Sequence, residues 1–336
     1  MKKMMLGPLS EKKKRWEEMT PVPVGAARNI KNVVGDKMDD RFAGILIGLA
    51  VGDALGVSLE FKERDSYQPL TGMEGGGHFD LEPGQWTDDT SMALCLAESL
   101  LAKGFSHQDQ LDKYLKWLNE GYLSSTGSCF AVGRNTMLSL KEYEESGKLP
   151  PERERAAGNG SLMRLAPVPM YYRNDFDKAV YYSGQSSLST HNNPMAVDAC
   201  RFFGALLQQA LQQDRTKGVM SKEELLRGKA CELELVAEVR EIAEGSYRKK
   251  GRKEISSSGF VIHTLEAALW SFYRSDNFRE AVLTAVNLGD DADTVGSVTG
   301  QLAGAYYGLS NIPEEWVAVL AQRGYIIELI KHLYKK

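Results

Sequence analysis

Apolar residues recur at intervals of three and four positions along almost the whole chain from Asp40 onward. This is the period with which an amphipathic helix turns one face toward a core. No alternating apolar and polar run and no Asn-Gly hairpin signal interrupts it. The sequence therefore predicts an all-α fold, with one compact multi-helix domain over residues 39–336. The predicted helices span residues 40–56, 89–103, 108–119, 129–142, 176–189, 194–213, 221–246, 261–273, 277–287, 293–307 and 313–334.

Two of the predicted helices carry glycine at every fourth position, on one helix face. Each glycine costs about 1 kcal/mol of helix propensity relative to alanine, so we expect a compensating close approach of two helix backbones. In a membrane this spacing is typical of a helix dimer, but Asp53 and Asp293 favour a buried crossing in a soluble domain. If the two faces meet, Asp53 comes close to the acidic loop before the second helix. The glycines are Gly44, Gly48, Gly52 and Gly56 in one helix and Gly296, Gly300 and Gly304 in the other.

Residues 1–38 differ from the rest of the chain. They are rich in Lys and Arg, and a short helical stretch is followed by Pro21 and Pro23, which cannot continue a helix because proline lacks the donor N–H. We predict an N-terminal extension, an arm outside the helical domain, with Trp16 and Met19 as anchors for a binding partner. A solvated, disordered tail is the alternative.

Composition narrows the class of protein. The 336 residues carry a formal net charge of −4 at pH 7, with 43% hydrophobic and 26% charged residues. This balance gives no general attraction to nucleic acid or to an anionic membrane, so neither is an expected partner. The most apolar run, residues 42–59, is interrupted by Asp53 and contains four glycines, so no membrane-spanning helix is expected. The four cysteines are widely spaced and no apolar signal segment opens the chain, which indicates reduced thiols in a cytoplasmic protein.

Two short acidic loops are the strongest chemical signal. QWTDDT (85–90) and GDDADT (289–294) each lead into a predicted helix. A single aspartate at a helix start is commonly a cap, but adjacent carboxylates repel one another unless a cation lies between them. Carboxylates with threonine hydroxyls beside them suit Mg²⁺, Mn²⁺ or Ca²⁺ better than zinc, and the five histidines show no zinc-binding spacing. Five carboxylates exceed the needs of one Mg²⁺, so a two-metal site is favoured.

A series of longer motifs surrounds these loops. In chain order they read RFAGILIGLAVGDALG, QWTDDTSMAL, GYLSSTGSCF, GNGSLMRLAPVPM, STHNNP, SSGFVIHTLEAALW, NLGDDADTVGSVTGQLAGAYYG and IPEEW. With this ordered set the chain resembles the ADP-ribosylglycohydrolases from about Arg41 to Ile330, in particular the bacterial branch resembling dinitrogenase reductase-activating glycohydrolase. The resemblance implies an all-α enzyme that binds two divalent cations, Mg²⁺ first and Mn²⁺ second. It also implies release of ADP-ribose from modified protein side chains, with arginine as the first expected acceptor and serine as another.

The resemblance further implies which residues form the site. The GNGSLMR loop would cradle the diphosphate and ribose through backbone N–H groups, and Asp53 would lie behind the metal ligands. His191 would reach the same ligand, with a satisfied core histidine as the alternative. Phe260 would lie against adenine, with ordinary helix-core packing as the alternative. The implied catalytic residues are Glu60, Asp89 and Asp291. The implied metal ligands are Thr87, Asp88, Asp89, Asp291, Asp293 and Thr294. The implied substrate-binding residues are Asn159, Gly160, Ser161, Met163, Arg164, His191 and Phe260.

One position departs from the pattern of the related bacterial enzymes. Where they carry an aspartate near the substrate side chain, this chain has Ala131, in CFAVGRNT. Three interpretations follow. Another acid such as Glu60 or Asp89 does the work, the substrate differs, or the chain binds its ligand with weak catalysis.

Two functions from different classes fit these residues. The first is a hydrolase that removes ADP-ribose from proteins and so reverses an ADP-ribosyltransferase toxin. The second is an immunity protein that binds and blocks a cognate ADP-ribosyltransferase through residues 1–38, with or without hydrolysis. A non-enzymatic nucleotide sensor is disfavoured because every predicted metal ligand is present.

Overall fold

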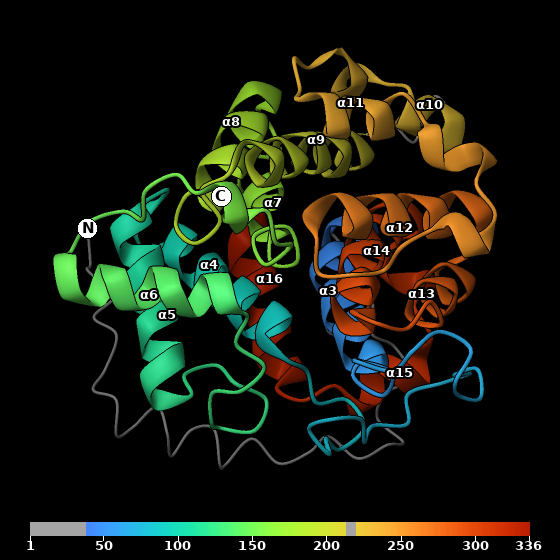
Figure 1. Cartoon of the computed structure of the whole chain (residues 1–336), viewed down its shortest axis with the longest axis horizontal. Coiled ribbons are helices and arrows are strands. Elements are labelled where there is room, and N and C mark those ends of the chain that lie inside the picture. Colours follow the sequence, from blue (N-terminus) through green and yellow to red (C-terminus); the bar gives the residue numbers. More distant parts are fainter. Residues whose placement is uncertain (1–37, 213–219) are drawn as a thin grey trace.

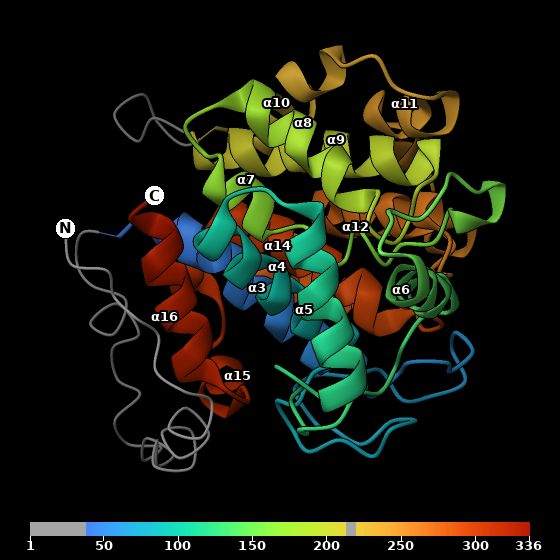
Figure 2. The ribbon, with the colours of Figure 1, turned by 90° about the vertical axis from the view of Figure 1, so that its left-hand side faces the viewer.

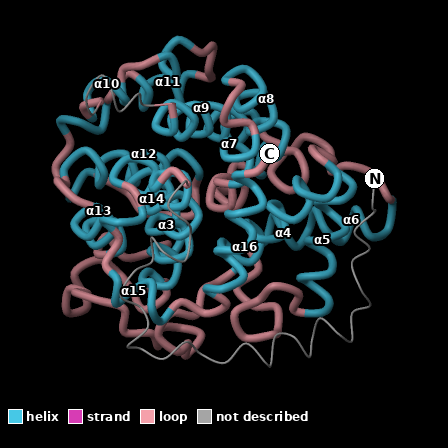
Figure 3. The backbone as a smooth tube through the Cα atoms, turned by 180° about the vertical axis from the view of Figure 1, so that it is seen from behind, coloured by secondary structure: helices cyan, strands magenta, loops and turns pink. Residues whose placement is uncertain are grey.

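The computed structural model describes residues 38–212 and 220–336, which form helices joined by loops (Figure 3). Within these two ranges there is no β-strand, only isolated bridges between Gly76 and Leu81 and between Gly158 and Phe260. The all-α prediction is therefore confirmed. The α-helices are α3 (Asp40–Gly56), α4 (Asp88–Lys103), α5 (His107–Glu120), α6 (Arg134–Ser146), α7 (Pro167–Tyr171), α8 (Phe176–Ser187), α9 (Pro194–Leu211), α10 (Lys222–Leu226), α11 (Ala237–Ala243), α12 (Val261–Arg274), α13 (Phe278–Val286), α14 (Ala292–Tyr307), α15 (Glu314–Val319) and α16 (Arg323–Tyr334).

Helices α3 and α14 cross at the centre of the molecule in backbone contact (Figure 1). A Cβ atom placed on Gly48 would lie 2.2 Å from the carbonyl oxygen of Gly300, and one on Gly52 would lie 2.0 Å from that of Gly296. Only a hydrogen atom fits at these separations, so the predicted meeting of the two glycine faces is confirmed. From Arg41 onward α3 is buried on all sides.

The other helices enclose this central pair. Helices α12 and α13 pack against α14, α9 lies over α14 and α12, and α4 and α16 cover the remaining side of α3 (Figures 1 and 2). The crossing places the last turn of α3 beside the first turns of both α4 and α14. The two acidic motifs, about 200 residues apart in sequence, thus meet because each opens a helix that packs on the same partner.

Three predicted helices have different bounds in the structure. The segment 221–246 contains α10 and α11 with 3₁₀ turns around them, because Gly228 and Gly245 interrupt it, Gly245 with a left-handed φ of 92°. The segment 313–334 is divided into α15 and α16 at Leu320–Gln322. The helix predicted from residue 129 begins at Arg134, after a loop in which Ala131 has a φ of 58°. The short helix α7 was not predicted.

The predicted arm, residues 1–38, falls outside the described residues except for Met38. Among the helices that the structure does describe, none combines the length and the apolar character needed to cross a bilayer.

Candidate active site between two acidic loops and a glycine loop

The acidic loops meet at the threonine that precedes α4. Thr87 Oγ1 lies 2.9 Å from Asp53 Oδ1, 3.2 Å from Asp293 Oδ2 and 3.4 Å from Asp89 Oδ2. These carboxylates come from the end of α3 and the starts of α14 and α4. Thr294, on the other acidic loop, places its Oγ1 3.4 Å from the same Asp89 oxygen. The structure therefore brings together predicted ligands from both loops, and it confirms that Asp53 lies close to the second loop.

Asp53 is the acid that holds the first loop in place. Its Oδ1 accepts hydrogen bonds from Thr87 N (3.0 Å) and Thr87 Oγ1 (2.9 Å). Its Oδ2 accepts from Thr90 N (3.0 Å) and Thr90 Oγ1 (2.6 Å). The side chain is wholly inaccessible to solvent, and this burial raises the pKa of Asp53 to about 6 although the four donors act in the opposite direction. Asp53 therefore fixes the start of α4 from behind the predicted ligands.

The remaining carboxylates have fewer hydrogen-bond donors around them than their oxygen atoms could accept. A hydroxyl has one proton, so Thr87 can donate to only one of the three carboxylate oxygens around it. Burial raises the pKa values of Asp88, Asp89 and Asp291 well above the ordinary range, and the neighbouring acids add to the effect. For Asp293, burial and the charge of Asp53 raise the pKa to about 6. This part of the site lacks positive charge.

Glu60 belongs to the same group although it lies in the loop after α3. Burial raises its pKa to about 11, and the negative charges of Asp293, Asp88 and Asp291 contribute. Its Oε2 atom is buried and has no hydrogen-bond partner among the described residues. The carboxyl group is therefore protonated at neutral pH as long as no cation lies nearby.

The donor set fits hard divalent cations, with one restriction. Mg²⁺ and Mn²⁺ bind carboxylate and hydroxyl oxygens. The carboxyl groups of Asp291 and Asp293 lie within hydrogen-bonding range of each other. Two carboxylates tolerate this separation only with a proton or a cation between them. Over the described ranges, however, no three His, Cys, Asp or Glu side chains already form a group that could hold a metal ion. A metal site here would therefore need the threonine hydroxyls, water, or small shifts of the carboxylates.

The glycine-containing loop at 157–164 forms a second wall. Asn159 Nδ2 donates to Asp291 Oδ2 (2.7 Å) and to Thr264 Oγ1 (2.8 Å), and Asn159 N donates to Gly259 O (3.1 Å). These contacts join the loop to the second acidic loop and to the start of α12. Among the described residues, no hydrogen-bond acceptor faces the N–H groups of Gly160 and Ser161. Backbone donors are thus available beside the carboxylates.

Arg164 lies behind this loop and not at its surface. It is 0% exposed, and its guanidinium donates to Gly160 O (3.1 Å) and Thr190 Oγ1 (2.7 Å), with further acceptors at Ser186 and Ser189. The guanidinium therefore orders the loop from the interior, and the ligand contact predicted for this loop, through its backbone N–H groups, stays a prediction. The side chains of Ser161 and Met163 are also buried, which leaves the backbone as the part of the loop able to reach a ligand.

His191 is linked to the same guanidinium. Thr190 Oγ1 accepts from Arg164 and lies 2.9 Å from His191 Nδ1. The threonine hydroxyl can either donate its proton to Nδ1, with the imidazole N–H then on Nε2, or accept a second hydrogen bond from Nδ1–H, with Nε2 then an acceptor. That nitrogen is directed toward Gly158 and Gly160, since a Cβ on either glycine would lie within 3.2 Å of it. Burial and the charge of Arg164 lower the pKa of His191 to about 3, so the ring is neutral.

Phe260 and Ala131 lie at the edges of the site. Phe260 is partly buried and packs edge-on against His263, with 5.1 Å between ring centroids, and the bridge between Gly158 and Phe260 fixes it next to the glycine loop. Its contact with adenine stays a prediction. Ala131 is partly buried and adds only a methyl group.

Three residues that position the site were not predicted. Thr90 donates to Asp53, Ser297 Oγ donates to Asp89 Oδ1 (2.5 Å), and Thr190 joins Arg164 to His191. Ser297 follows Asp293 by four residues and therefore shares its helix face, a signal that the sequence contained. Thr190 had no such signal, because its role depends on Arg164, 26 residues earlier.

Comparison with known proteins finds one matching family, similar proteins in other organisms and a similar solved structure. Residues 35–336 match the model of the family described as ADP-ribosylglycohydrolase. The chain is 40% identical over 306 residues to the ADP-ribosylarginine hydrolase Tri1 of Serratia proteamaculans, covering 88% of this chain and 79% of that protein. It is 32% identical over 295 residues to the ADP-ribosyl-[dinitrogen reductase] glycohydrolase of Rhodospirillum rubrum, covering 86% and 92%. A solved structure described as an ADP-ribosylglycohydrolase-related protein complex has a TM-score of 0.77 and 40% identity, covering 88% of this chain and 97% of that one.

Proposed function

The chain belongs to the ADP-ribosylglycohydrolase family and is a hydrolase, and from that premise we propose that it removes ADP-ribose from arginine side chains with the help of two divalent cations. Mg²⁺ is the first candidate and Mn²⁺ the second. The observation that carries the proposal is the wall of carboxylates from two distant helix starts, whose pKa values are raised by burial and by one another's negative charge. The relatives described as ADP-ribosylarginine hydrolases support arginine as the acceptor.

The acidic wall would hold the ribose end of the substrate. Thr87, Asp88 and Asp89 from one loop and Asp291, Asp293 and Thr294 from the other are the proposed metal ligands. When bound, such cations fix the ribose hydroxyls and make a water molecule more acidic. Asp53 keeps Thr87 oriented through its two hydrogen bonds. Glu60, whose carboxyl group borders the proposed ligands, is the proposed catalytic acid or base beside the reacting bond.

The glycine-loop wall would hold the diphosphate. The N–H groups of Gly160 and Ser161 can donate to phosphate oxygens without adding a charged side chain. In the tautomer that carries the N–H on Nε2, the neutral His191 would add a further donor on the same side. Asn159 connects the two walls through Asp291, so the diphosphate and the ribose are placed relative to each other. This fixed placement favours the oxocarbenium-like transition state in which the bond to the acceptor breaks.

Purified protein tests this proposal directly. With Mg²⁺ it should release ADP-ribose from an ADP-ribosylarginine substrate, and EDTA should stop the reaction reversibly. Asp88→Asn or Asp293→Asn should lower kcat by at least about 100-fold, the order expected for loss of a metal ligand, while the circular dichroism spectrum remains helical. Full activity of the Asp88→Asn, Asp293→Asn double variant in EDTA would refute the two-cation mechanism.

We also propose that residues 1–38 bind an ADP-ribosyltransferase whose product the enzyme removes. The family match begins at residue 35, so residues 1–34 of the arm lie outside it. Its sequence combines Trp16 and Met19 with the basic run 12–15, and apolar anchors with charges that steer approach are typical of binding segments. Deletion of residues 1–38 should leave hydrolysis intact and abolish co-elution with such a transferase. An inactive or unfolded truncated protein would show that the arm is structural.

A further inference from the structure

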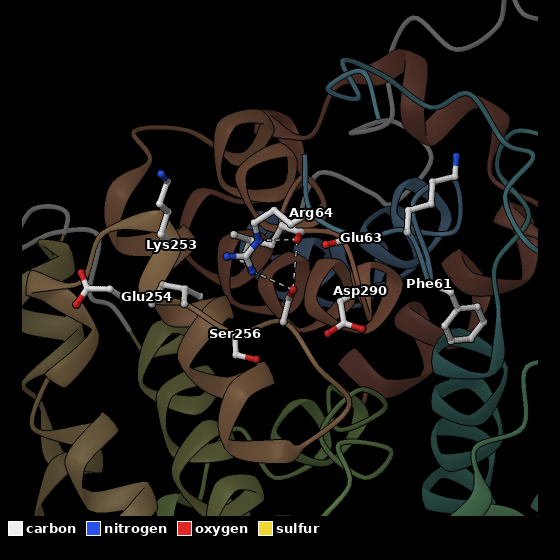
Figure 4. Close-up of a pocket in the computed structure, with 11 residues that line it drawn as sticks. Phe61, Glu63, Arg64, Lys253, Glu254, Ser256 and Asp290 are labelled. Carbon is white, nitrogen blue, oxygen red and sulfur yellow. Dashed lines mark hydrogen bonds between the residues drawn. The ribbon is translucent and has the colours of Figure 1, made fainter. Parts of the chain in front are cut away.

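A surface cavity of about 590 Å³ adjoins the second acidic loop. The Glu60 loop, the segment before α12 and the loop before α14 enclose it, with Phe61, Ser256 and Asp290 among the lining residues. Figure 4 shows these three side chains along one side, whereas Lys253 and Glu254 lie at the opposite end. The cavity therefore has a face with an aromatic ring, a hydroxyl and a carboxylate, separate from an end that carries one positive and one negative side chain.

Two backbone hydrogen bonds fix the position of Asp290. Asp290 N donates to Lys62 O (2.9 Å), and Phe61 N donates to Asp290 O (2.7 Å). The residue has a left-handed φ of 60° and is exposed. Its two backbone bonds hold Phe61 and Asp290 in one unit. Within the described ranges the Asp290 carboxylate makes no hydrogen bond or ion pair.

Arg64 also lines the cavity, and three of its five N–H donors are engaged by other acceptors. The guanidinium donates to Leu288 O (2.9 Å), Arg252 O (2.8 Å) and Ser257 Oγ (3.2 Å). The charge of Asp290 acts on Arg64, but only as a minor effect. Arg64 thus fastens the Glu60 loop to the neighbouring segments and leaves Asp290 available to a ligand.

The cavity borders the acidic wall, because two of its lining residues are chain neighbours of acids in that wall. Asp290 directly precedes Asp291, whose N–H donates to the carbonyl oxygen of Ser257, a residue that lines the cavity (3.0 Å). Phe61 likewise follows Glu60. A ribose carbon held at the acidic wall would have its acceptor group within reach of this cavity.

We infer that this face of the cavity binds the guanidinium of the modified arginine, with Asp290 as the residue that selects a cationic acceptor and Phe61 packed against it. The inference rests on the proposed hydrolysis of ADP-ribosylarginine. A guanidinium offers paired N–H donors that match a carboxylate, and its flat surface stacks on aromatic rings. Phe61 is 63% exposed, so its ring is accessible to such a group. Ala131 supplies no charge at the site.

Asp290→Asn tests the inference because asparagine tolerates the left-handed backbone as well as aspartate does. The full-length variant is assayed with Mg²⁺ on ADP-ribosylarginine and on an ADP-ribosylserine peptide, and ADP-ribose binding is measured by calorimetry. We expect KM for ADP-ribosylarginine to rise about three- to tenfold, as for loss of a charge-assisted pair. The ADP-ribosylserine reaction and the ADP-ribose affinity should stay within twofold. Glu254→Gln removes one negative charge at the opposite end and is the matched control.

Two results would overturn the inference. One is an unchanged KM for ADP-ribosylarginine in Asp290→Asn. The other is an equal loss with both substrates or with ADP-ribose, which would assign Asp290 to the acidic wall or the nucleotide site. If the wild-type protein cleaves only the serine substrate, the proposed function is wrong for arginine. That failure is seen in the wild type, whereas failure of the inference about Asp290 is seen only in the comparison of Asp290→Asn with an active wild type.

Discussion

The two walls of the site bury ionisable groups in opposite ways. On the glycine-loop wall, Arg164 is fully buried, yet its guanidinium donates to backbone and hydroxyl oxygens on several segments. His191, next to it, is neutral because its pKa is lowered to about 3. On the acidic wall, the carboxylates of Asp88, Asp89 and Asp291 lie together with raised pKa values and too few donors.

The difference separates structural from functional burial of charge. A buried charge that is fully hydrogen-bonded needs nothing from outside, and it fixes the backbone around it. Buried like charges without partners are unfavourable until an external ion or proton compensates them. The Arg164 wall is therefore complete as it stands and presents neutral donors, whereas the acidic wall needs a ligand of opposite charge.

The acidic wall depends on the glycine crossing beneath it, so breaking the crossing should have the largest effect. A Cβ on Gly300 would lie 2.0 Å from Gly48 O, and that oxygen belongs to a rigid helix. We expect Gly300→Ala to lower the free energy of unfolding by more than about 4 kcal/mol, or to prevent folding. Thermal and urea denaturation measure it.

Gly72→Ala is the control for that substitution, because the nearest atom to its added Cβ is 3.8 Å away. It should change the free energy of unfolding by less than about 1 kcal/mol. Equal stability of Gly300→Ala and Gly72→Ala would show that the two helices can separate without loss, and the acidic loops would then owe their positions to something else.

The glycine-loop wall should have a smaller effect, which appears in how the free energy of unfolding changes with pH. The pKa of His191 is about 3 in the folded protein against an ordinary 6.5. Between these values the unfolded chain binds a proton that the folded chain does not, so stability falls as the pH falls. We expect the loss due to His191 to be about 1.4 kcal/mol for each pH unit below 6.5. Urea unfolding of wild type and His191→Gln at pH 4.5 to 8 measures it as the difference between the two proteins.

The comparison with His191→Gln is needed because the acidic wall acts with the opposite sign. Asp53, with its pKa raised to about 6, keeps a proton that the unfolded chain releases above 3.8, so its contribution to stability is lost as the pH rises through this window. The two effects partly cancel in the wild type. If the His191→Gln variant loses stability with falling pH as steeply as the wild type, His191 is not held neutral by its surroundings.

Much of the helical architecture followed from local pattern. The period of apolar residues located the long helices, such as α3, α9, α12 and α14, within a few residues. It failed where short breaks depend on single residues, since Gln322 adopts a φ of 45° between α15 and α16. It also missed α7, a five-residue helix too short to show a period.

For the site, sequence indicated which residues matter better than it indicated how they act. The acidic motifs and the glycine loop are adjacent in space as predicted. The sequence did not show, however, that the Arg164 side chain lies in the interior, because a motif shows that a residue is needed but not which way its side chain points. Thr190 and Thr90 were missed since ordinary hydroxyl residues carry no distinctive signal, and Ser297 was missed although its spacing from Asp293 placed it on the same helix face.

The sequence by itself determined the helical class, the backbone contact between two glycine faces, and two loops whose clustered carboxylates call for cations. These features depend on residue type and spacing along one segment, so no knowledge of distant neighbours is required. Only the tertiary structure decided that Asp53 is satisfied by four donors, that Asp290 faces a cavity while the adjacent Asp291 bonds to Asn159, and that His191 Nδ1 lies against the Thr190 hydroxyl. Each of these depends on groups from segments far apart in the chain, because a buried polar atom acts according to the partners that folding brings to it.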